Sequence, residues 1–109
     1  MRAGRLRTRL HIEEAVETRT SDGGVSPGWS SIGTAWAWVR GLRGRELFSA
    51  QQINPQTTHK VTMHYRSGLT SANRLVDKTS SRIFNIESVV NIDERNRVLE
   101  LICTEVAGA

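Results

Sequence analysis

The chain has 109 residues, which suits a single domain over residues 1–109, and its 38% hydrophobic and 24% charged residues are typical of globular rather than disordered proteins. Its longest uninterrupted apolar stretch, Ala35 to Val39, is too short to cross a bilayer, so we expect no membrane partner. The net charge of +4 is carried mainly by arginine, which favours contact with polyanions such as DNA or with acidic protein surfaces.

The N-terminal segment alternates between two kinds of residue. One face of an extended chain would carry Leu6, Thr8, Leu10 and Ile12, and the other Arg5, Arg7, Arg9 and His11. This period of two predicts a strand from about Arg5 to Val16 with one buried and one basic face. Arginine-rich mitochondrial presequences are an alternative interpretation of this segment.

The next segment, Thr18 to Gly28, is rich in Ser, Thr, Gly and Asp and predicts a loop. Extended structure resumes near Trp29, and a strand is predicted from Gly33 to Leu42. There Trp36 and Trp38 alternate with small or branched residues, and we expect Trp36 to lie in the core.

A long excursion follows, from Arg43 to Thr57, with a glycine near its start and little apolar content. Residues 45–52 have moderate helical propensity, and Pro55 would end any helix there. We therefore expect one long loop that contains a short helix, of the kind that is usually functional or mobile.

Four more strands are predicted at near-hairpin spacing: Thr58 to Arg66, Arg74 to Asp77, Arg82 to Ile92 and Arg97 to Val106. In the third, Val90 and Ile92 fall on the face of Phe84 and Ile86. Five or six short strands predict a mostly-β protein, a small antiparallel β-barrel or sandwich. The predicted core comprises Leu6, Leu10, Trp36, Val61, Met63, Phe84, Ile86, Leu99 and Leu101.

Catalytic and metal-binding patterns are weak. His59 and His64 are five residues apart on one predicted strand, and an odd separation places them on opposite faces. The lone Cys103 and scattered histidines give no closed ligand set for zinc, and Gly23-Gly24 lacks the Lys-Ser/Thr of a phosphate loop. We expect no enzyme, no cofactor and no metal, with Cys103 as a small buried apolar residue in a reducing compartment.

Several short sequence fragments are informative because of their order and spacing along the chain. They are the opening MRAGRLRTRLHIEE, Asp22-Gly23-Gly24 with Trp29, Trp36, Gly44-Arg45-Glu46 with Phe48, His59 with Val61 and Tyr65-Arg66, and the run from Phe84 to Arg97 with Leu99-Glu100-Leu101. Together they resemble the phage head–tail joining family of head-closure (stopper) and head–tail adaptor proteins. One departure is the Ser/Thr-rich turn from Asp77 to Ser81, which is longer than the tight Asp/Gly turn of the family.

The resemblance implies a structural protein of the virion neck, synthesised in the bacterial cytoplasm. Such proteins form a ring between the portal-bound adaptor and the tail, and close the DNA channel after packaging. The implied partners are other copies in a hexameric or dodecameric ring, the adaptor or portal-side neck protein, the tail terminator and packaged double-stranded DNA. A DNA channel needs only cations that face phosphates.

Two sets of candidate site residues follow from this resemblance. The first is the basic strand face, expected to contact an acidic surface of a neighbouring subunit or adaptor: Arg5, Arg7 and Arg9. The second is the excursion, expected to meet near the ring axis and block the channel: Arg43, Arg45, Ser49, Gln51, Gln52, Asn54 and Gln56. The plainer alternatives are a solvated basic face and a loop that packs against an adjacent subunit.

Two other functions remain open. A nucleic-acid-binding β-barrel would need aromatic side chains exposed on a sheet face for base stacking, and we expect most of Trp29, Trp36, Trp38 and Tyr65 to be core residues instead. The second is another ring component of the neck or tail, such as a tail terminator.

Overall fold

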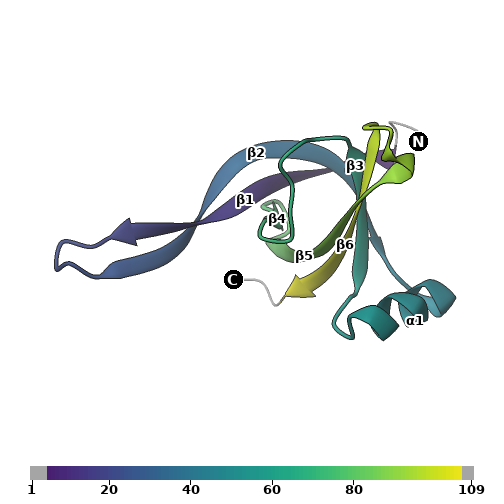
Figure 1. The fold of residues 1–109 in the computed structure, drawn as a ribbon, viewed down its shortest axis with the longest axis horizontal. Coiled ribbons are helices and arrows are strands. Elements are labelled where there is room, and N and C mark those ends of the chain that lie inside the picture. Colours follow the sequence, from purple (N-terminus) through teal and green to yellow (C-terminus); the bar gives the residue numbers. More distant parts are fainter. Residues whose placement is uncertain (1–4, 107–109) are drawn as a thin grey trace.

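The computed structural model describes residues 5–106, which form a closed barrel of six antiparallel strands with one helix outside it (Figure 1). The elements in chain order are β1 (Thr8–Arg19), β2 (Val25–Gly41), α1 (Gly44–Ile53), β3 (His59–His64), β4 (Arg74–Asp77), β5 (Arg82–Asn91), the 3-10 helix η2 (Ile92–Glu94) and β6 (Val98–Val106). The strand order around the barrel is β1-β2-β3-β6-β5-β4, and β4 pairs back to β1. The predicted mostly-β barrel, with a short helix in its long connection, is confirmed. No helix among the described residues is both long and apolar enough to cross a bilayer.

The barrel interior is filled by side chains that alternate inward along the strands. Its buried apolar residues are Leu10, Ile12, Ala37, Val61, Met63, Leu75, Phe84, Ile86, Leu99, Leu101 and Cys103. Leu6 is also buried, so every predicted core residue except Trp36 is confirmed. Burial raises the pKa of the Cys103 thiol to about 12, which keeps this side chain protonated at neutral pH.

The prediction that Trp36 lies in the core is wrong. Trp36 is 57% exposed, whereas its neighbour Ala37 is completely buried. Ala37 lies opposite Thr8 of β1 and Met63 of β3, inside the barrel. A six-stranded barrel has a narrow interior that must mix small and large side chains, so β2 turns its alanine inward and its indole outward.

A second error concerns β5, where Val90 was expected on the face of Phe84. Val90 is 45% exposed, and Val89 packs against the core instead. The β5–β6 register shifts between Ile86 and Ser88, which is a β-bulge. One extra residue inverts the inward–outward alternation of everything that follows it.

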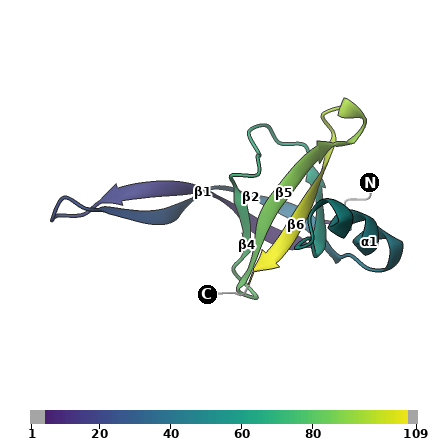
Figure 2. The ribbon, with the colours of Figure 1, turned by 60° about the horizontal axis from the view of Figure 1, so that its bottom comes forward.

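The expected loop from Thr18 to Gly28 is mostly strand. β1 continues to Arg19 and β2 starts at Val25, and a short turn joins them in which Thr20 N–H donates to Gly24 O at 2.9 Å. β1 pairs with β4 only from His11 to Glu13, and β2 pairs with β3 only from Ala37 onward. Residues 14–30 therefore leave the barrel as a two-stranded ribbon, here called the arm, which gives the molecule its 50 Å long axis (Figures 1 and 2).

Arg74 of β4 fixes the root of the arm. Its Nε donates to Glu13 Oε1 at 2.7 Å, and its guanidinium lies 4.1 Å from the ring centroid of Trp29. Glu13 is buried, and at this point the β1–β2 register shifts, with Ile32 as the extra residue on β2. A bulge of this kind bends a strand, and here the ion pair and the cation–π contact hold the bent ribbon against the barrel.

The outer edge of β2 is protected next to the arm. The Arg66 guanidinium donates to Ile32 O at 3.2 Å and to Thr34 O at 3.4 Å. Between these two carbonyls lies Gly33, where a Cβ atom would clash with the same guanidinium. A charged side chain that crosses an open sheet edge blocks unwanted strand pairing, and Gly33 leaves the space for it.

The core assignment can be tested with one truncation. Leu101→Ala should lower the free energy of unfolding by about 2–5 kcal/mol, because Leu101 is fully buried between β3 and β5. The control Val90→Ala alters an exposed side chain and should change it by less than about 0.5 kcal/mol. Urea unfolding followed by tryptophan fluorescence measures both, and equal losses would contradict the assignment.

The arm root generates a second prediction. Arg74→Met keeps the length of the side chain but removes both contacts and leaves Glu13 without its partner, so we expect a loss of about 1–3 kcal/mol. Amide hydrogen exchange should accelerate more in the arm than in the barrel. The control Arg19→Met removes an exposed arginine of the arm itself. Equal exchange rates in the two variants would show that Arg74 does not hold the arm.

Candidate functional site

The arm has one apolar and one polar face. Residues directly opposite each other in an antiparallel pair share a face. The register gathers on one face the pairs Ala15–Trp29, Glu17–Pro27 and Arg19–Val25, and on the other Glu14–Ser30, Val16–Gly28 and Thr18–Ser26. Val25 and Trp29 are 57% and 43% exposed. A two-stranded ribbon is only marginally stable in water, and large exposed apolar patches mark candidate contact surfaces, so the apolar face makes the arm a candidate interaction site.

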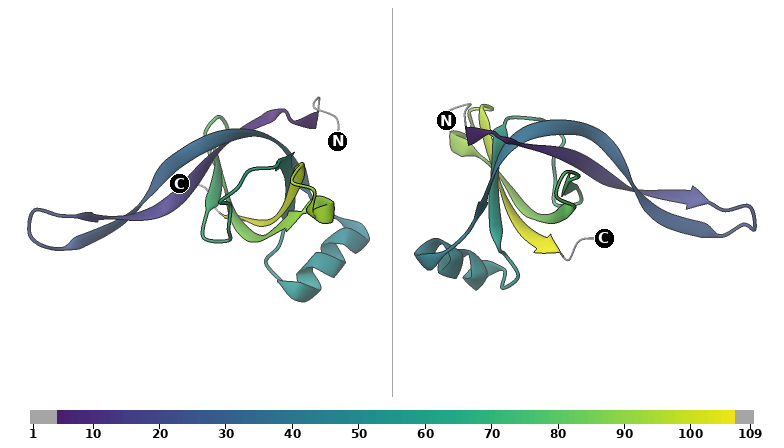
Figure 3. Two further views of the ribbon diagram at one scale, coloured as in Figure 1. Left: turned by 45° about the horizontal axis from the view of Figure 1, so that its top comes forward. Right: turned by 180° about the vertical axis from the view of Figure 1, so that it is seen from behind.

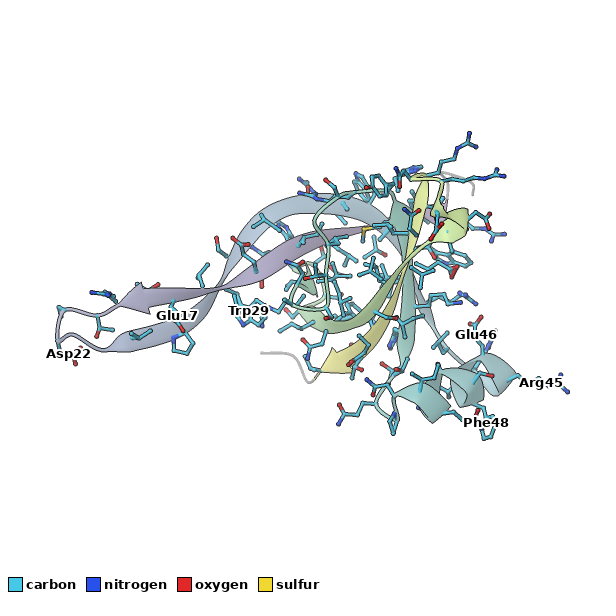
Figure 4. The ribbon with its side chains drawn as sticks, viewed as in Figure 1. Glu17, Asp22, Trp29, Arg45, Glu46 and Phe48 are labelled. Carbon is cyan, nitrogen blue, oxygen red and sulfur yellow. The ribbon has the colours of Figure 1, made fainter. Side chains whose placement is uncertain are left out.

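The arm is also acidic, although the whole chain has a net charge of +4. It carries the carboxylates of Glu14, Glu17 and Asp22 against the single cation of Arg19. At the tip, the Thr20 hydroxyl donates to the Asp22 carboxylate, and Gly24 N–H donates to it at 3.2 Å. These hydrogen bonds, the one from Thr20 first, lower the pKa of Asp22 and keep the tip negatively charged. Glu17, Asp22 and Trp29 are labelled in Figure 4.

The helix α1 stands outside the barrel wall (Figure 3). None of its residues is buried. It is attached by polar contacts: Asn54 Nδ2 donates to Glu87 Oε2 at 2.7 Å and Gln51 Nε2 to Thr57 O at 3.1 Å. Glu46 pairs with Arg40 at 3.0 Å and with Lys60 at 3.4 Å. The helix is thus held by polar contacts, and none of its apolar side chains is fully buried.

Two large apolar side chains of α1 face solvent. Phe48 is 67% exposed and Ile53 is 90% exposed. A groove of about 430 Å³ runs between α1 and the barrel, with Leu42, Ile53, Thr57 and Ile102 in its lining. The Thr57 hydroxyl is buried and has no hydrogen-bond partner within residues 5–106. The helix and its groove therefore present a second surface with exposed apolar side chains.

The structure places the predicted channel residues as follows. Arg43, Arg45, Ser49, Gln52 and Gln56 are exposed, whereas Gln51 and Asn54 are half-buried and make the hydrogen bonds that attach α1. The expected polar loop is thus largely a helix. At 3.6 residues per turn, Arg45, Phe48, Ser49 and Gln52 share its outward face.

The predicted assembly residues Arg5, Arg7 and Arg9 are exposed on the outer barrel wall. The Arg5 guanidinium lies 4.9 Å from the Trp38 ring centroid, and that of Arg40 lies 5.1 Å from it. Arg9 is directly opposite Trp36 in the β1–β2 register. We call this surface the basic wall; it comprises Arg5, Arg7, Arg9, Trp36, Trp38 and Arg40. The expectation that most of the aromatic residues are core residues is wrong.

The two predicted sets are connected by Arg40, which stacks on Trp38 of the basic wall and pairs with Glu46 of α1. Within residues 5–106 no three metal-ligating side chains come together. His59 lies beside Arg82 and Glu105, and burial lowers its pKa and favours the neutral ring.

Sequence reasoning missed the arm as an element. A signal was present, because Val25, Pro27 and Trp29 repeat with a period of two directly after a Gly-Gly turn. Proline lowers the expectation of a strand, but it is tolerated on an edge, and both strands of the arm are edges beyond the barrel.

Comparison with known proteins agrees across nearly the whole chain. The family model of phage head completion proteins matches residues 1–106. The head completion protein gp7 of Enterobacteria phage HK97 is 33% identical over 109 residues, covering 100% of this chain and 87% of that protein. The solution structure of protein SF1141 from Shigella flexneri 2a has a TM-score of 0.77 at 28% identity, covering 98% of each chain.

A chain from the virion of a native gene transfer agent particle shares the fold, with a TM-score of 0.57 at 20% identity over 90% of this chain and 93% of that chain. The extent of the family match and the identity to the HK97 protein show the family of this chain. It belongs to the phage head completion proteins, which are structural components of the virion and not a family of enzymes.

Proposed function

We propose that this chain forms a homo-oligomeric ring in the virion neck, between the portal or its adaptor and the tail, and that the ring closes the DNA channel after packaging. Family membership supports a structural role in the virion. The observation that carries the finer proposal is α1, which lies outside the barrel and buries none of its residues. A segment that gives up little buried surface when it moves suits a gate.

In such a ring, copies of α1 would meet near the axis. The outward face of the helix offers Phe48 for apolar contact between copies, with Ser49 and Gln52 for hydrogen bonds. The gate would move as a rigid helix about its ends, one of which is Gly44 with a φ of 61°. Arg43 and Arg45 would contact the phosphates of passing DNA, an interaction that weakens with salt.

The basic wall would hold the ring in place. Arginine pairs with carboxylates in a planar, bidentate geometry and is enriched at protein interfaces. We assign Arg5, Arg7 and Arg9 to contact with an acidic surface of a neighbouring subunit or of the adaptor.

The opposite rim of the ring would then present the docking surface for the tail terminator. The terminator role itself is less well supported, because the family match is to head completion proteins.

One observation favours a second function, a nucleic-acid-binding barrel. Trp36 is exposed beside Arg9, and the guanidinium groups of Arg5 and Arg40 both lie over the Trp38 ring. Exposed aromatic and basic residues on one sheet face are what base stacking requires. Titration with single-stranded oligonucleotides separates the two functions: a stacking protein quenches tryptophan fluorescence in a base-dependent way, and a neck protein binds weakly and without base preference.

The gate is tested by removal of α1. Leu42 N–H donates to Thr58 O at 3.0 Å, so the ends of the excursion are adjacent and a short Gly-Ser turn can replace residues 43–56. We expect rings to assemble but packaged DNA to leak before tails attach, because nothing blocks the axis. Nuclease-protected DNA in tailless heads measures the leak, and negative-stain microscopy of the same heads checks ring assembly. Full genome retention in heads with intact rings would place the gate elsewhere.

The basic wall is tested by charge reversal. Arg5→Glu with Arg9→Glu should abolish attachment to the neck while the isolated chain stays folded, because both side chains lie outside the core. The control Lys78→Glu with Arg95→Glu makes the same charge change at exposed turns. Copies per purified head, measured by quantitative blotting, report attachment, and circular dichroism reports folding. Undiminished attachment of the wall variant would refute the assignment.

A further inference from the structure

We infer that the acidic surface contacted by the basic wall is the arm of a second copy of this chain, so that neighbouring copies join head to tail, arm on wall. This inference deepens the proposed ring and rests on it. The proposed function leaves two partners for the basic wall, the neighbouring subunit and the adaptor. Here the partner is the neighbouring subunit.

The first argument is charge. The arm carries three carboxylates against one arginine in a chain whose net charge is +4: Glu17 lies with Arg19 on the apolar face, Glu14 on the opposite face and Asp22 at the tip. The wall carries Arg5, Arg7, Arg9 and Arg40, and Arg40 also pairs with Glu46 of α1 at 3.0 Å. Charges segregated on one chain in this way attract different surfaces of two copies and repel like surfaces, which sets the orientation of the pair.

The second argument is apolar surface. The arm exposes Val25, Pro27 and Trp29 on one face, and the wall exposes Trp36. A marginal two-stranded ribbon becomes stable when its apolar face packs on another sheet, and the outer wall of a barrel is such a sheet. Tryptophan and arginine are the residues that dominate the energetics of protein interfaces.

The third argument is position. Arg5 precedes the first residue of β1, and the arm includes the last part of the same strand, so the two surfaces lie toward opposite ends of β1 (Figure 1). Different patches at opposite ends make a heterologous interface, and repeated use of it closes into a ring when the rotation per copy permits. In the structure the arm extends away from the barrel and does not lie on its own wall (Figure 1).

The interface is tested by crosslinking in assembled particles. Val25→Cys places a thiol on the arm and Thr34→Cys places one beside the wall; both positions are exposed. Nine residues of strand separate them by roughly 30 Å, so a short bis-maleimide crosslinker cannot join them within one chain. The single native thiol, that of Cys103, is fully buried. We expect a ladder of dimers and higher multimers on a denaturing gel.

The matched control pairs Val25→Cys with Thr79→Cys, an exposed position in the β4–β5 turn. The control should give no ladder. Particles that incorporate the Val25/Thr34 variant without a ladder, or with one no stronger than the control, overturn the inference. Electron microscopy of the same necks reports the ring independently: rings without a ladder overturn only the arm-on-wall contact, and necks without rings overturn the proposed function as well.

Charge reversal on both surfaces distinguishes a second copy from the adaptor. Glu14→Arg with Glu17→Arg reverses one carboxylate on each face of the arm without disturbing the Asp22 turn, and should by itself abolish incorporation. Combined in one chain with Arg5→Glu and Arg9→Glu, it should restore incorporation, because the reversed surfaces again complement each other. Circular dichroism checks that every variant folds. Loss without rescue in folded chains would mean that the acidic surface belongs to the adaptor.

Discussion

The rest of the structure depends on the closure of the barrel by β4. This strand has four residues and pairs with β1 over only three, from His11 to Glu13. β1 and β2 are far longer than this contact. Residues 14–30 therefore pair only with each other and extend from the barrel as the arm. β4 also supplies Arg74, which binds Glu13 and stacks on Trp29 at the point of exit. A short strand thus both seals the core and sets the direction of the arm.

A narrow, closed barrel has few interior positions, and this limits how much apolar surface one copy can bury. Ala37 occupies an inward position of β2, while Trp36 is left on the outer wall. The arm and α1 likewise leave Trp29, Val25, Phe48 and Ile53 uncovered. A chain of 109 residues has little surplus stability, and contacts between copies are an economical way to cover such surfaces.

The two elements outside the barrel differ in how firmly they are held. The arm is continuous with barrel strands and is clamped at its root, so it suits a fixed contact. The helix α1 is joined through polar contacts such as Asn54 with Glu87, and it buries none of its residues. The same fold therefore combines an arm that is continuous with the barrel and a helix that is held to it by polar contacts.

The sequence by itself determined the fold class, most of the core and the outward direction of Arg5, Arg7 and Arg9, because a period of two specifies a half-buried strand without knowledge of its neighbours. It also indicated the helix within residues 45–52 through propensity and Pro55. Only the tertiary structure decided which face of β2 turned inward, where the bulge inverted β5, and that residues 18–28 continued as strands. These features depend on barrel width and on where β4 stops pairing, which are set by contacts between distant segments and leave no local signal.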